Sequence, residues 1–246
     1  MLGRGPRGQG APGTDRIIKM FLTTFITPLY LILWHILWIR NNFYFISIHL
    51  QCNCVSPFEI LALQVANRHN TLLRPLAVGD EIVAANVHIH SWRETYAGVI
   101  DDATLDELPI KFAERVERWQ NIIDESLSAC DKKTIVAVKD KNIVGFARVG
   151  VDRDGAFEGA GELWSLYLLR ACQRKQIGYL LLCEAMKFLR ENGYRSAYAW
   201  VLAANPTMAF YRRSGAVETG IRKTLDIGGK QYEAHAMQWN SLDQFV

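Results

Sequence analysis

Cysteine is scarce in this sequence, and its few cysteines do not stand at a spacing typical of metal binding or redox chemistry. The 246 residues hold five cysteines, an odd number for a disulfide framework. The two nearest ones, Cys52 and Cys54, flank a single residue, and no CxxC pair occurs. The pair Cys52 and Cys54 alone is therefore a poor signal for a zinc or redox site. We expect no bound metal and a reducing compartment, in which thiols stay free.

A strong excess of charge of one sign is also missing from most of the chain. Residues 1–69 hold six Lys or Arg and two acidic residues, whereas residues 70–246 hold 22 basic and 23 acidic residues. Binding to a phosphate backbone needs a positively charged surface. The balance in residues 70–246 therefore argues against nucleic acid as their partner. Half of the whole chain is hydrophobic, which indicates a packed core rather than disorder.

The composition changes sharply near the N-terminus. Residues 1–14 are rich in Gly, Pro and Arg, so we expect a disordered tail there. Residues 20–39 contain no Asp, Glu, Lys or Arg, and fifteen of these twenty residues are apolar, Tyr or Trp. That length matches a helix that crosses a bilayer. We therefore divide the chain into an N-terminal extension (residues 1–69), with a candidate transmembrane helix followed by a linker, and a domain (residues 70–246).

Three interpretations of residues 20–39 stay open: a membrane anchor, a cleaved signal peptide, and an upstream segment that is not part of the working protein. A signal peptide is disfavoured because no small-x-small cleavage site follows the apolar stretch. For an anchor, the Arg and Lys residues that precede the segment predict an N-terminus inside the cell. The domain would then lie outside, which conflicts with any need for a cytosolic cofactor.

The hydrophobic pattern from residue 70 onward predicts a compact domain of mixed helices and strands. Alternation and turn residues mark the strands, whereas apolar residues three and four apart mark the helices. Ile82 and Ala85 are expected on the buried face of the first helix, and Gly193 is expected to end the third. Expected strands are 72–76, 134–138, 143–149, 161–169, 197–202, 217–227 and 231–239, and expected helices lie around 82–92, 112–123, 177–193 and 205–215.

The passage from Arg170 to Tyr179 carries the first sign of chemistry. It reads RACQRKQIGY and leads into an apolar helix. A basic loop before a helix N-terminus offers free backbone N–H groups, a favourable dipole and cationic side chains to a phosphate. Gly178 would let the backbone approach such a group closely. A solvated turn explains the same residues, so the loop alone leaves both interpretations open.

A second passage, NPTMAFYRRSGA from Asn205 to Ala216, favours the phosphate-binding interpretation. Asn205 and Pro206 suit the N-cap and the first residue of a helix. Together the two passages resemble the GNAT superfamily of N-acetyltransferases. The segment 173–178 resembles the family's pyrophosphate loop, Gln/Arg-x-x-Gly-x-Gly/Ala, and the segment 205–216 resembles its Asn-x-x-Ala-x-x-Phe-Tyr-x-x-x-Gly-Phe helix.

The resemblance extends over about residues 70–239. Leu73-Arg74-Pro75 and the segment 87–98 look like the first strand and helix of many bacterial members. The fold class that this implies is an α/β (α+β) domain with a mixed, mostly antiparallel, twisted sheet of about seven strands, splayed between the fourth and fifth strands and flanked by about four helices. Two positions depart from the family pattern: Gln176 replaces the first loop glycine, and Ala216 replaces a phenylalanine.

The resemblance implies acetyl-CoA as co-substrate and assigns residues to it. Backbone N–H groups of Tyr167 and Leu168 would bind the pantetheine arm and the thioester oxygen. Asn205 would reach the pantetheine amide besides capping its helix. The pyrophosphate would lie against a loop formed by Gln173, Arg174, Lys175, Gln176, Ile177 and Gly178.

Acetyl transfer to an amine also needs a proton for the departing thiolate and a base for the amine. Tyr211 is placed like the family tyrosine that protonates the sulfur of coenzyme A, unless it is only a buried aromatic. Some relatives use a glutamate on the fifth strand as base, and Trp200 stands at that place here. Glu162 on the fourth strand is then the candidate base, acting through a water, or else a charge at a strand edge.

His88 and His90 are alternative bases or plain helix residues, and the second interpretation is favoured. Trp92, Arg93 and Tyr96 lie where the first helix of this family helps to wall the acceptor site. Trp92 would serve equally well as a core residue.

We therefore expect an N-acetyltransferase that moves the acetyl group of acetyl-CoA to a primary amine by direct attack in a ternary complex. Its acceptor would be a small molecule or a protein amine. The alternative is a membrane-tethered, GNAT-like module that binds acyl-CoA without catalysis. The catalytic domain is expected in the cytoplasm, while membrane association through residues 20–39 and the formation of a homodimer are left open.

Overall fold

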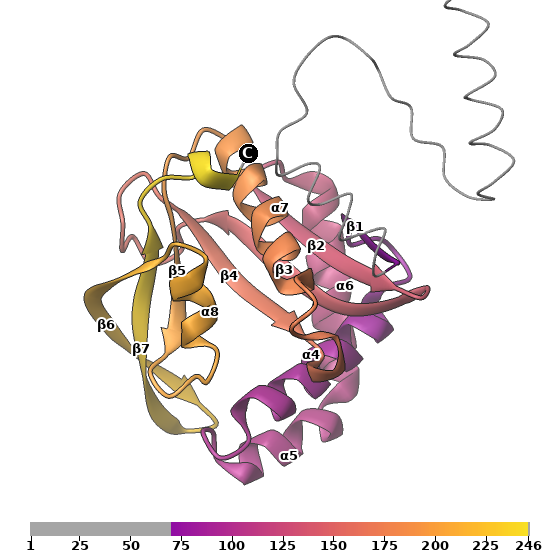
Figure 1. Cartoon of the computed structure of the whole chain (residues 1–246). Helices are drawn as coiled ribbons and strands as arrows, with labels where there is room; N and C mark the ends of the chain where they lie inside the picture. Colours follow the sequence, from indigo (N-terminus) through magenta and orange to yellow (C-terminus); the bar gives the residue numbers. More distant parts are fainter. Residues whose placement is uncertain (1–69, 246) are drawn as a thin grey trace, which may run out of the picture. The chain divides into compact units, whose positions relative to one another are not determined.

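The computed structural model describes residues 70–245 (Figure 1). The N-terminal extension, including the apolar stretch at residues 20–39, lies outside the described residues. The strands are β1 (Thr71–Pro75), β2 (Lys132–Lys139), β3 (Asn142–Val151), β4 (Gly161–Leu168), β5 (Ala197–Leu202), β6 (Val217–Ile227) and β7 (Lys230–Trp239). The helices are α4 (Glu81–Tyr96), α5 (Asp102–Ile110), α6 (Phe112–Ser128), α7 (Ile177–Glu191) and α8 (Met208–Arg213), with short 3₁₀ turns at Arg170–Cys172 and Asp243–Phe245.

The strands form one sheet in the order β1-β2-β3-β4-β5-β7-β6, as Figure 1 shows. Neighbouring strands are antiparallel except β4 and β5, which are parallel. Hairpin turns at Asp140-Lys141 and at Gly228-Gly229 join β2 to β3 and β6 to β7. All four turn residues have positive φ, between 50° and 78°, as two-residue turns of type I′ require. The mixed, mostly antiparallel sheet that the family resemblance implied is confirmed.

The sheet opens between β4 and β5. The two strands pair at only two positions, which Gly161 and Glu162 of β4 occupy. Just beyond, β4 carries a bulge in which Trp164 is an extra residue opposite the junction of Arg148 and Val149 on β3. A bulge bends its strand and increases the local twist. The second half of β4 therefore leaves β5, and the expected splay between the fourth and fifth strands is confirmed.

Helices cover both faces of the sheet. α7 packs on one face, where its Leu181 joins a buried cluster with Ile135 of β2 and Val149 of β3. α4 and α6 cover the opposite face, where the ring of Trp119 meets the ring of Phe146 edge to face, with centroids 4.7 Å apart. Figure 1 shows α7 and α6 on opposite sides of β2 and β3. Because side chains alternate along a strand, β2 and β3 supply buried residues to both cores.

A clasp joins the start of α5 to the tip of the β6–β7 hairpin, on the side where β4 and β5 separate (Figure 1). The Lys230 ammonium lies 2.6 Å from Asp101 Oδ1, and the Asp101 N–H donates to the Tyr232 hydroxyl at 3.0 Å. Gly228 packs directly on Thr104, with no room for a side chain. The clasp therefore holds the β6–β7 hairpin against the start of α5.

The sequence pattern does not predict α5. This helix buries only Leu105 and Leu108 and contains Pro109, so its periodic signal is short and interrupted. The buried face of α4 also differs from the prediction. Ala85 lies in the core as predicted, but Ile82 is 54% exposed, and Ala84 is buried in its place.

The helix predicted from Asn205 begins later, at Met208. Asn205 Oδ1 accepts the N–H of Thr207 at 2.8 Å in a turn that precedes α8. Asn205 is therefore a turn residue rather than the N-cap, which is Thr207. None of the helices within residues 70–245 has both the length and the apolar character that crossing a membrane requires.

Candidate active site

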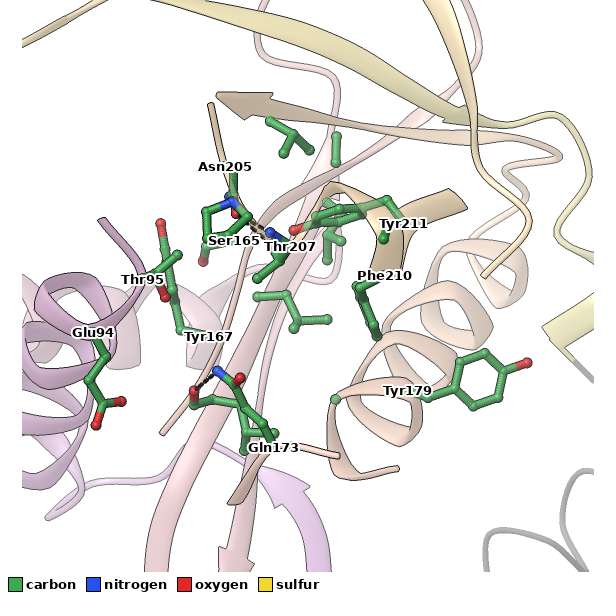
Figure 2. Close-up of a pocket in the computed structure, with 18 of the residues that line it drawn as sticks. Glu94, Thr95, Ser165, Tyr167, Gln173, Tyr179, Asn205, Thr207, Phe210 and Tyr211 are labelled. Carbon is green, nitrogen blue, oxygen red and sulfur yellow. Dashed lines mark hydrogen bonds between the residues drawn. The ribbon is translucent and has the colours of Figure 1, made fainter. Parts of the chain in front are cut away.

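A cavity of about 590 Å³, the donor cavity, lies where β4 and β5 separate (Figure 2). The second half of β4, the loop before α7, β5, α8 and the end of α4 border it. Its size falls in the range of sites for small molecules and cofactors. Both sequence passages that pointed to chemistry meet at this cavity, through Gln173, Arg174, Gln176, Gly178, Asn205 and Tyr211.

The open edge of β4 supplies backbone groups to the donor cavity. The N–H of Leu169 donates to the carbonyl of Val144 on β3 at 3.0 Å. Successive residues of a strand point their N–H groups to opposite edges. The N–H groups of Leu168 and Leu166 therefore point toward the gap, and the N–H of Tyr167 points toward β3. Contrary to the expectation, Tyr167 offers its side chain to the cavity and not its N–H.

The loop before α7 ends in a left-handed residue, Gln176, with φ 63° and ψ −5°. A residue with a side chain is strained in this region by about 1 kcal/mol. The Gln176 carbonyl accepts the N–H of Leu180 at 3.0 Å. The N–H groups of residues 177–179 consequently have no partner within the helix. Together with the helix dipole, these groups form an anion-binding helix start.

The side chains of this loop point in different directions. Arg174 lines the donor cavity, whereas the Lys175 ammonium donates to a backbone carbonyl of the same loop, that of Ala171, at 2.9 Å. The side chain of Ile177 is fully buried, so only its N–H can reach a ligand. Gln173 Nε2 donates to the carbonyl of Leu168 at 3.1 Å and ties the loop to the end of β4 (Figure 2).

Gly178 leaves space beside the helix start. A Cβ added there would meet side-chain atoms of Phe210 and Leu168 at 3.7–4.0 Å, which is ordinary contact. Packing therefore does not require glycine, and the space that it leaves belongs to the donor cavity. Free N–H groups, the Arg174 guanidinium and this open space fit the pyrophosphate of coenzyme A.

Replacing Arg174 by alanine should weaken acetyl-CoA binding and make the remaining affinity less dependent on salt. A guanidinium beside a phosphate forms a charge-assisted hydrogen bond, and salt screens such an attraction. Isothermal titration at low and high salt measures both effects. Lys175→Ala is the matched control, because its ammonium faces a backbone carbonyl outside the cavity lining. Equal losses in the two variants would contradict the assignment.

Replacing Gln176 by glycine should raise both the melting temperature and the affinity for acetyl-CoA. Glycine relieves the left-handed strain, although its extra freedom in the unfolded chain offsets part of the gain. The net gain should stay below about 1 kcal/mol, which corresponds to at most roughly 2–4 °C for a domain of this size. Gln173→Gly, at a position with φ −69°, should lower the melting temperature. A lower melting temperature for Gln176→Gly would refute the account of this position.

Tyr211 lies on α8 and is 8% exposed. Its hydroxyl points inward from the helix, toward the side of the cavity where Asn205 and Thr207 lie (Figure 2). Burial raises the pKa of Tyr211 above that of an ordinary tyrosine, and Tyr96 adds to the effect. The hydroxyl therefore stays protonated at neutral pH and is available as a hydrogen-bond or proton donor.

Asn205 begins a short polar chain across the cavity wall. Its Nδ2 donates to the Tyr96 hydroxyl at 3.4 Å, and this hydroxyl lies 3.5 Å from the Tyr167 hydroxyl. Both distances are at the long end for hydrogen bonds, so these links are weak. Burial raises the pKa of Tyr96 and of Tyr167 above the ordinary value. Both tyrosines therefore remain neutral and can adjust to a bound ligand.

A second cavity of about 180 Å³ adjoins the first. We call it the acceptor cavity, after the role proposed for it below. The two cavities share four lining residues, all of them aromatic: Tyr96, Trp164, Tyr167 and Trp200. These residues come from the end of α4, the bulge and end of β4, and the middle of β5. The splay of β4 and β5 thus produces two chambers that meet at one aromatic boundary.

Glu162 lines the acceptor cavity but is only 1% exposed. Arg153 binds it through three contacts: Nη2 to Oε1 at 2.6 Å, and Nε and the backbone N–H to Oε2 at 3.1 Å each. A carboxylate held in this way is strongly hydrogen-bonded in its charged form. Glu162 therefore lies on β4, where the sequence predicts it, but the sequence does not reveal its ion pair with Arg153.

Two of the three residues expected to line the acceptor site do so. Trp92 and Tyr96 line the acceptor cavity. Arg93 lines neither cavity, and its guanidinium lies 3.2 Å from Asp106. His88 packs among aromatic rings between α4 and β3, and burial with three nearby arginines lowers its pKa to about 3. His88 is a neutral core residue, which agrees with the favoured interpretation.

The sequence pattern does not reveal three residues that line these cavities, namely Leu166, Arg153 and Lys223. Leu166 follows from the alternation of N–H groups along β4 once the bulge at Trp164 is known. The other two come from the β3–β4 loop and from β6, and no local motif marks them. Within residues 70–245 no group of three His, Cys, Asp or Glu side chains is arranged to hold a metal.

Comparison with known proteins gives the family. The model of the acetyltransferase (GNAT) family matches residues 90–216. An uncharacterised N-acetyltransferase of Bacillus subtilis, YuaI, is 32% identical over 159 residues, which make up 64% of this chain and 86% of the relative. A spermidine N(1)-acetyltransferase of Thermoplasma acidophilum is 28% identical over 144 residues, or 58% of this chain and 86% of the relative.

A solved structure supports the same assignment. The PaiA N-acetyltransferase of Thermoplasma acidophilum, crystallised in complex with coenzyme A, has a TM-score of 0.53 and 25% identity, covering 68% of this chain and 97% of that chain. The region that the family model matches contains the loop before α7, the open edge of β4 and Tyr211. The chain therefore belongs to the GNAT family and is an N-acetyltransferase whose acetyl donor is acetyl-CoA.

Proposed function

We propose that the domain transfers the acetyl group of acetyl-CoA to a primary amine by direct attack while both substrates are bound. The observation that carries this proposal is the shared aromatic boundary between the donor and acceptor cavities. A donor in one chamber and an amine in the other would meet there without an acetylated enzyme. The cavity linings also contain no cysteine among the described residues, which agrees with direct transfer.

Bound acetyl-CoA supplies an acetyl thioester, and the chain's own groups hold and activate it. The N–H groups at the start of α7 and the Arg174 guanidinium bind its pyrophosphate. The N–H groups of Leu166 and Leu168 bind the pantetheine arm and polarise the thioester carbonyl. Asn205 binds the amide of the pantetheine arm through the hydrogen-bonding capacity that remains free on its side chain. Tyr211 gives its proton to the departing sulfur.

Glu162 is the proposed base, and it acts through a water rather than by direct contact. Its burial and its three contacts with Arg153 leave little room for an amine at the carboxylate itself. Arg153 also holds the carboxylate in place, which makes it a positioning residue. Glu162→Gln should lower the turnover number while acetyl-CoA affinity stays near wild type, and an unchanged turnover would assign Glu162 to structure alone.

Initial-rate kinetics test the ternary complex. Release of free coenzyme A thiol is followed while acetyl-CoA and a primary amine are both varied. Intersecting double-reciprocal lines are expected for direct attack, whereas parallel lines would indicate an acetylated enzyme. Calorimetric binding of acetyl-CoA with no thiol release by any amine would instead favour the alternative of a non-catalytic module. Spermidine belongs among the amines tested, because one relative bears that name, and so does a peptide N-terminus.

We also propose that residues 70–246 act as a domain of their own and work in the cytoplasm, where acetyl-CoA is available. A chain that begins at residue 67 should be monodisperse and should show the same rise in melting temperature with acetyl-CoA as the full chain. Ligand binding to the folded state raises apparent stability, so the two rises compare the two affinities. Aggregation of the shorter chain, or the loss of its response, would show that the extension packs on the domain.

A further inference from the structure

Most of the residues that line the acceptor cavity are aromatic or aliphatic, although polar atoms make up the larger part of its exposed surface. Eleven residues form its wall. Five of them are aromatic and three are aliphatic, namely Leu202, Leu225 and Ile227. Only three are charged: Arg153, Glu162 and Lys223. At about 180 Å³ the cavity is smaller than typical sites for drug-sized ligands, so it suits a compact group. The recognition of an amine must therefore rest on these few charges and on the rings.

The one carboxylate of the cavity wall, that of Glu162, is already paired with Arg153. Glu162 accepts hydrogen bonds at both oxygens, and all of them come from Arg153. The ammonium group of a ligand would have to break this ion pair in a buried position, which is costly. Among the described residues of the wall, no carboxylate remains to neutralise a second positive charge.

Lys223 adds a positive charge to the same wall. Its ammonium lies over the ring of Trp200, 4.4 Å from the ring centroid, and is ion-paired with Asp154. Asp154 itself does not line the cavity. The face of Trp200 therefore already holds one cation on its Lys223 side. A further ammonium near this point would meet a like charge, which disfavours binding.

We infer that the acceptor is a primary amine with a single positive charge and a compact aromatic or branched apolar body, and that polyamines are poor acceptors. This inference rests on the proposed function and names its substrate class. The rings and aliphatic side chains bury the apolar body of such an amine. The cationic side chains of Arg153 and Lys223 in the wall favour the neutral form of its amino group, which is the form that attacks the thioester. A polyamine would bring further ammonium groups into a wall without a free carboxylate.

The test compares two amines on the full chain with acetyl-CoA. The kcat/KM for thiol release should be at least about tenfold higher with 2-phenylethylamine than with spermidine. Lys223→Met removes the repelling charge but keeps the apolar stem, so it should raise the ratio of spermidine to 2-phenylethylamine activity by at least about threefold. Lys223→Gln is a second variant with the same charge change, in case the methionine variant folds poorly.

Arg222→Met is the matched control. Arg222 is the neighbour of Lys223 on β6, it pairs with Glu233 at 3.3 Å, and it lines neither cavity. Its substitution removes one positive charge of the same strand and should leave the amine ratio unchanged. An equal change in both variants would show a general charge effect and overturn the role of Lys223.

The possible failures are distinguishable. A preference for spermidine over 2-phenylethylamine would overturn the inference while leaving the proposed acetyl transfer intact. Thiol release with neither amine, nor with any other primary amine, despite calorimetric binding of acetyl-CoA, would overturn the proposed function and the inference with it. An amine ratio that does not respond to either Lys223 variant would remove the electrostatic basis of the inference.

Discussion

Tyr211→Phe should lower the turnover number by roughly 10²-fold and leave the affinity for acetyl-CoA close to that of the wild type. The substitution removes one hydroxyl from a ring that is otherwise well packed beside Trp239, with ring centroids 6.1 Å apart. In the proposed mechanism this hydroxyl is the proton donor to the departing thiolate, and burial keeps it protonated at neutral pH. Steady-state rates and isothermal titration of acetyl-CoA separate the catalytic effect from binding.

Tyr194→Phe is the control for this result. Tyr194 follows α7, is partly buried against the same core and lines neither cavity. Its loss of a hydroxyl should leave the turnover number unchanged. If the rate of Tyr211→Phe equals that of wild type, Tyr211 serves packing only, and the proton for the sulfur comes from water or another group.

Gly178→Ala should weaken acetyl-CoA binding strongly while leaving the free protein as stable or more stable. Alanine favours a helix over glycine by up to about 1 kcal/mol, and its Cβ fits at ordinary contact distance in the free protein. The same methyl group occupies the space where the pyrophosphate must approach the N–H groups of α7. Loss of one hydrogen bond to a charged group costs roughly 1.5–3 kcal/mol, or roughly 10–150-fold in Kd.

The opposite signs of the two effects make this prediction specific. Thermal unfolding without ligand measures the stability, and calorimetry measures the Kd of acetyl-CoA. The KM of the amine is an internal control, since Gly178 does not line the acceptor cavity. Unchanged acetyl-CoA affinity would place the pyrophosphate elsewhere, whereas a large drop in melting temperature would mean that Gly178 is needed for folding.

Strands and turns could be predicted well from the sequence because their signals are local. The predicted strands at 197–202 and 217–227 coincide with β5 and β6. The turn at Asp140-Lys141 is marked by residue types that tolerate positive φ. α5 escaped prediction because it buries two residues only and contains a proline. The predicted start of α8 is too early because Asn205 belongs to the turn that precedes the helix.

The residues of the candidate site could be predicted only where a single continuous segment contains the complete family motif. The loop before α7 and the helix with Tyr211 each do so, and both reach the donor cavity. The direction of each N–H on β4 depends on a bulge at Trp164 that has no sequence signal. The acceptor cavity collects residues from α4, the β3–β4 loop, β4, β5 and β6. Its chemistry therefore emerges only when the splayed sheet brings these distant segments together.

The unpaired stretch of β4 has a consequence for the lifetime of the protein. Beyond its two pairs with β5, this strand presents free backbone donors and acceptors, as an edge strand does. Such an edge is a template on which another chain can add a strand and start aggregation. A bound donor would cover this edge with its own amide groups. The empty enzyme should therefore aggregate faster than the loaded one, so that its abundance in the cell would follow the supply of acetyl-CoA.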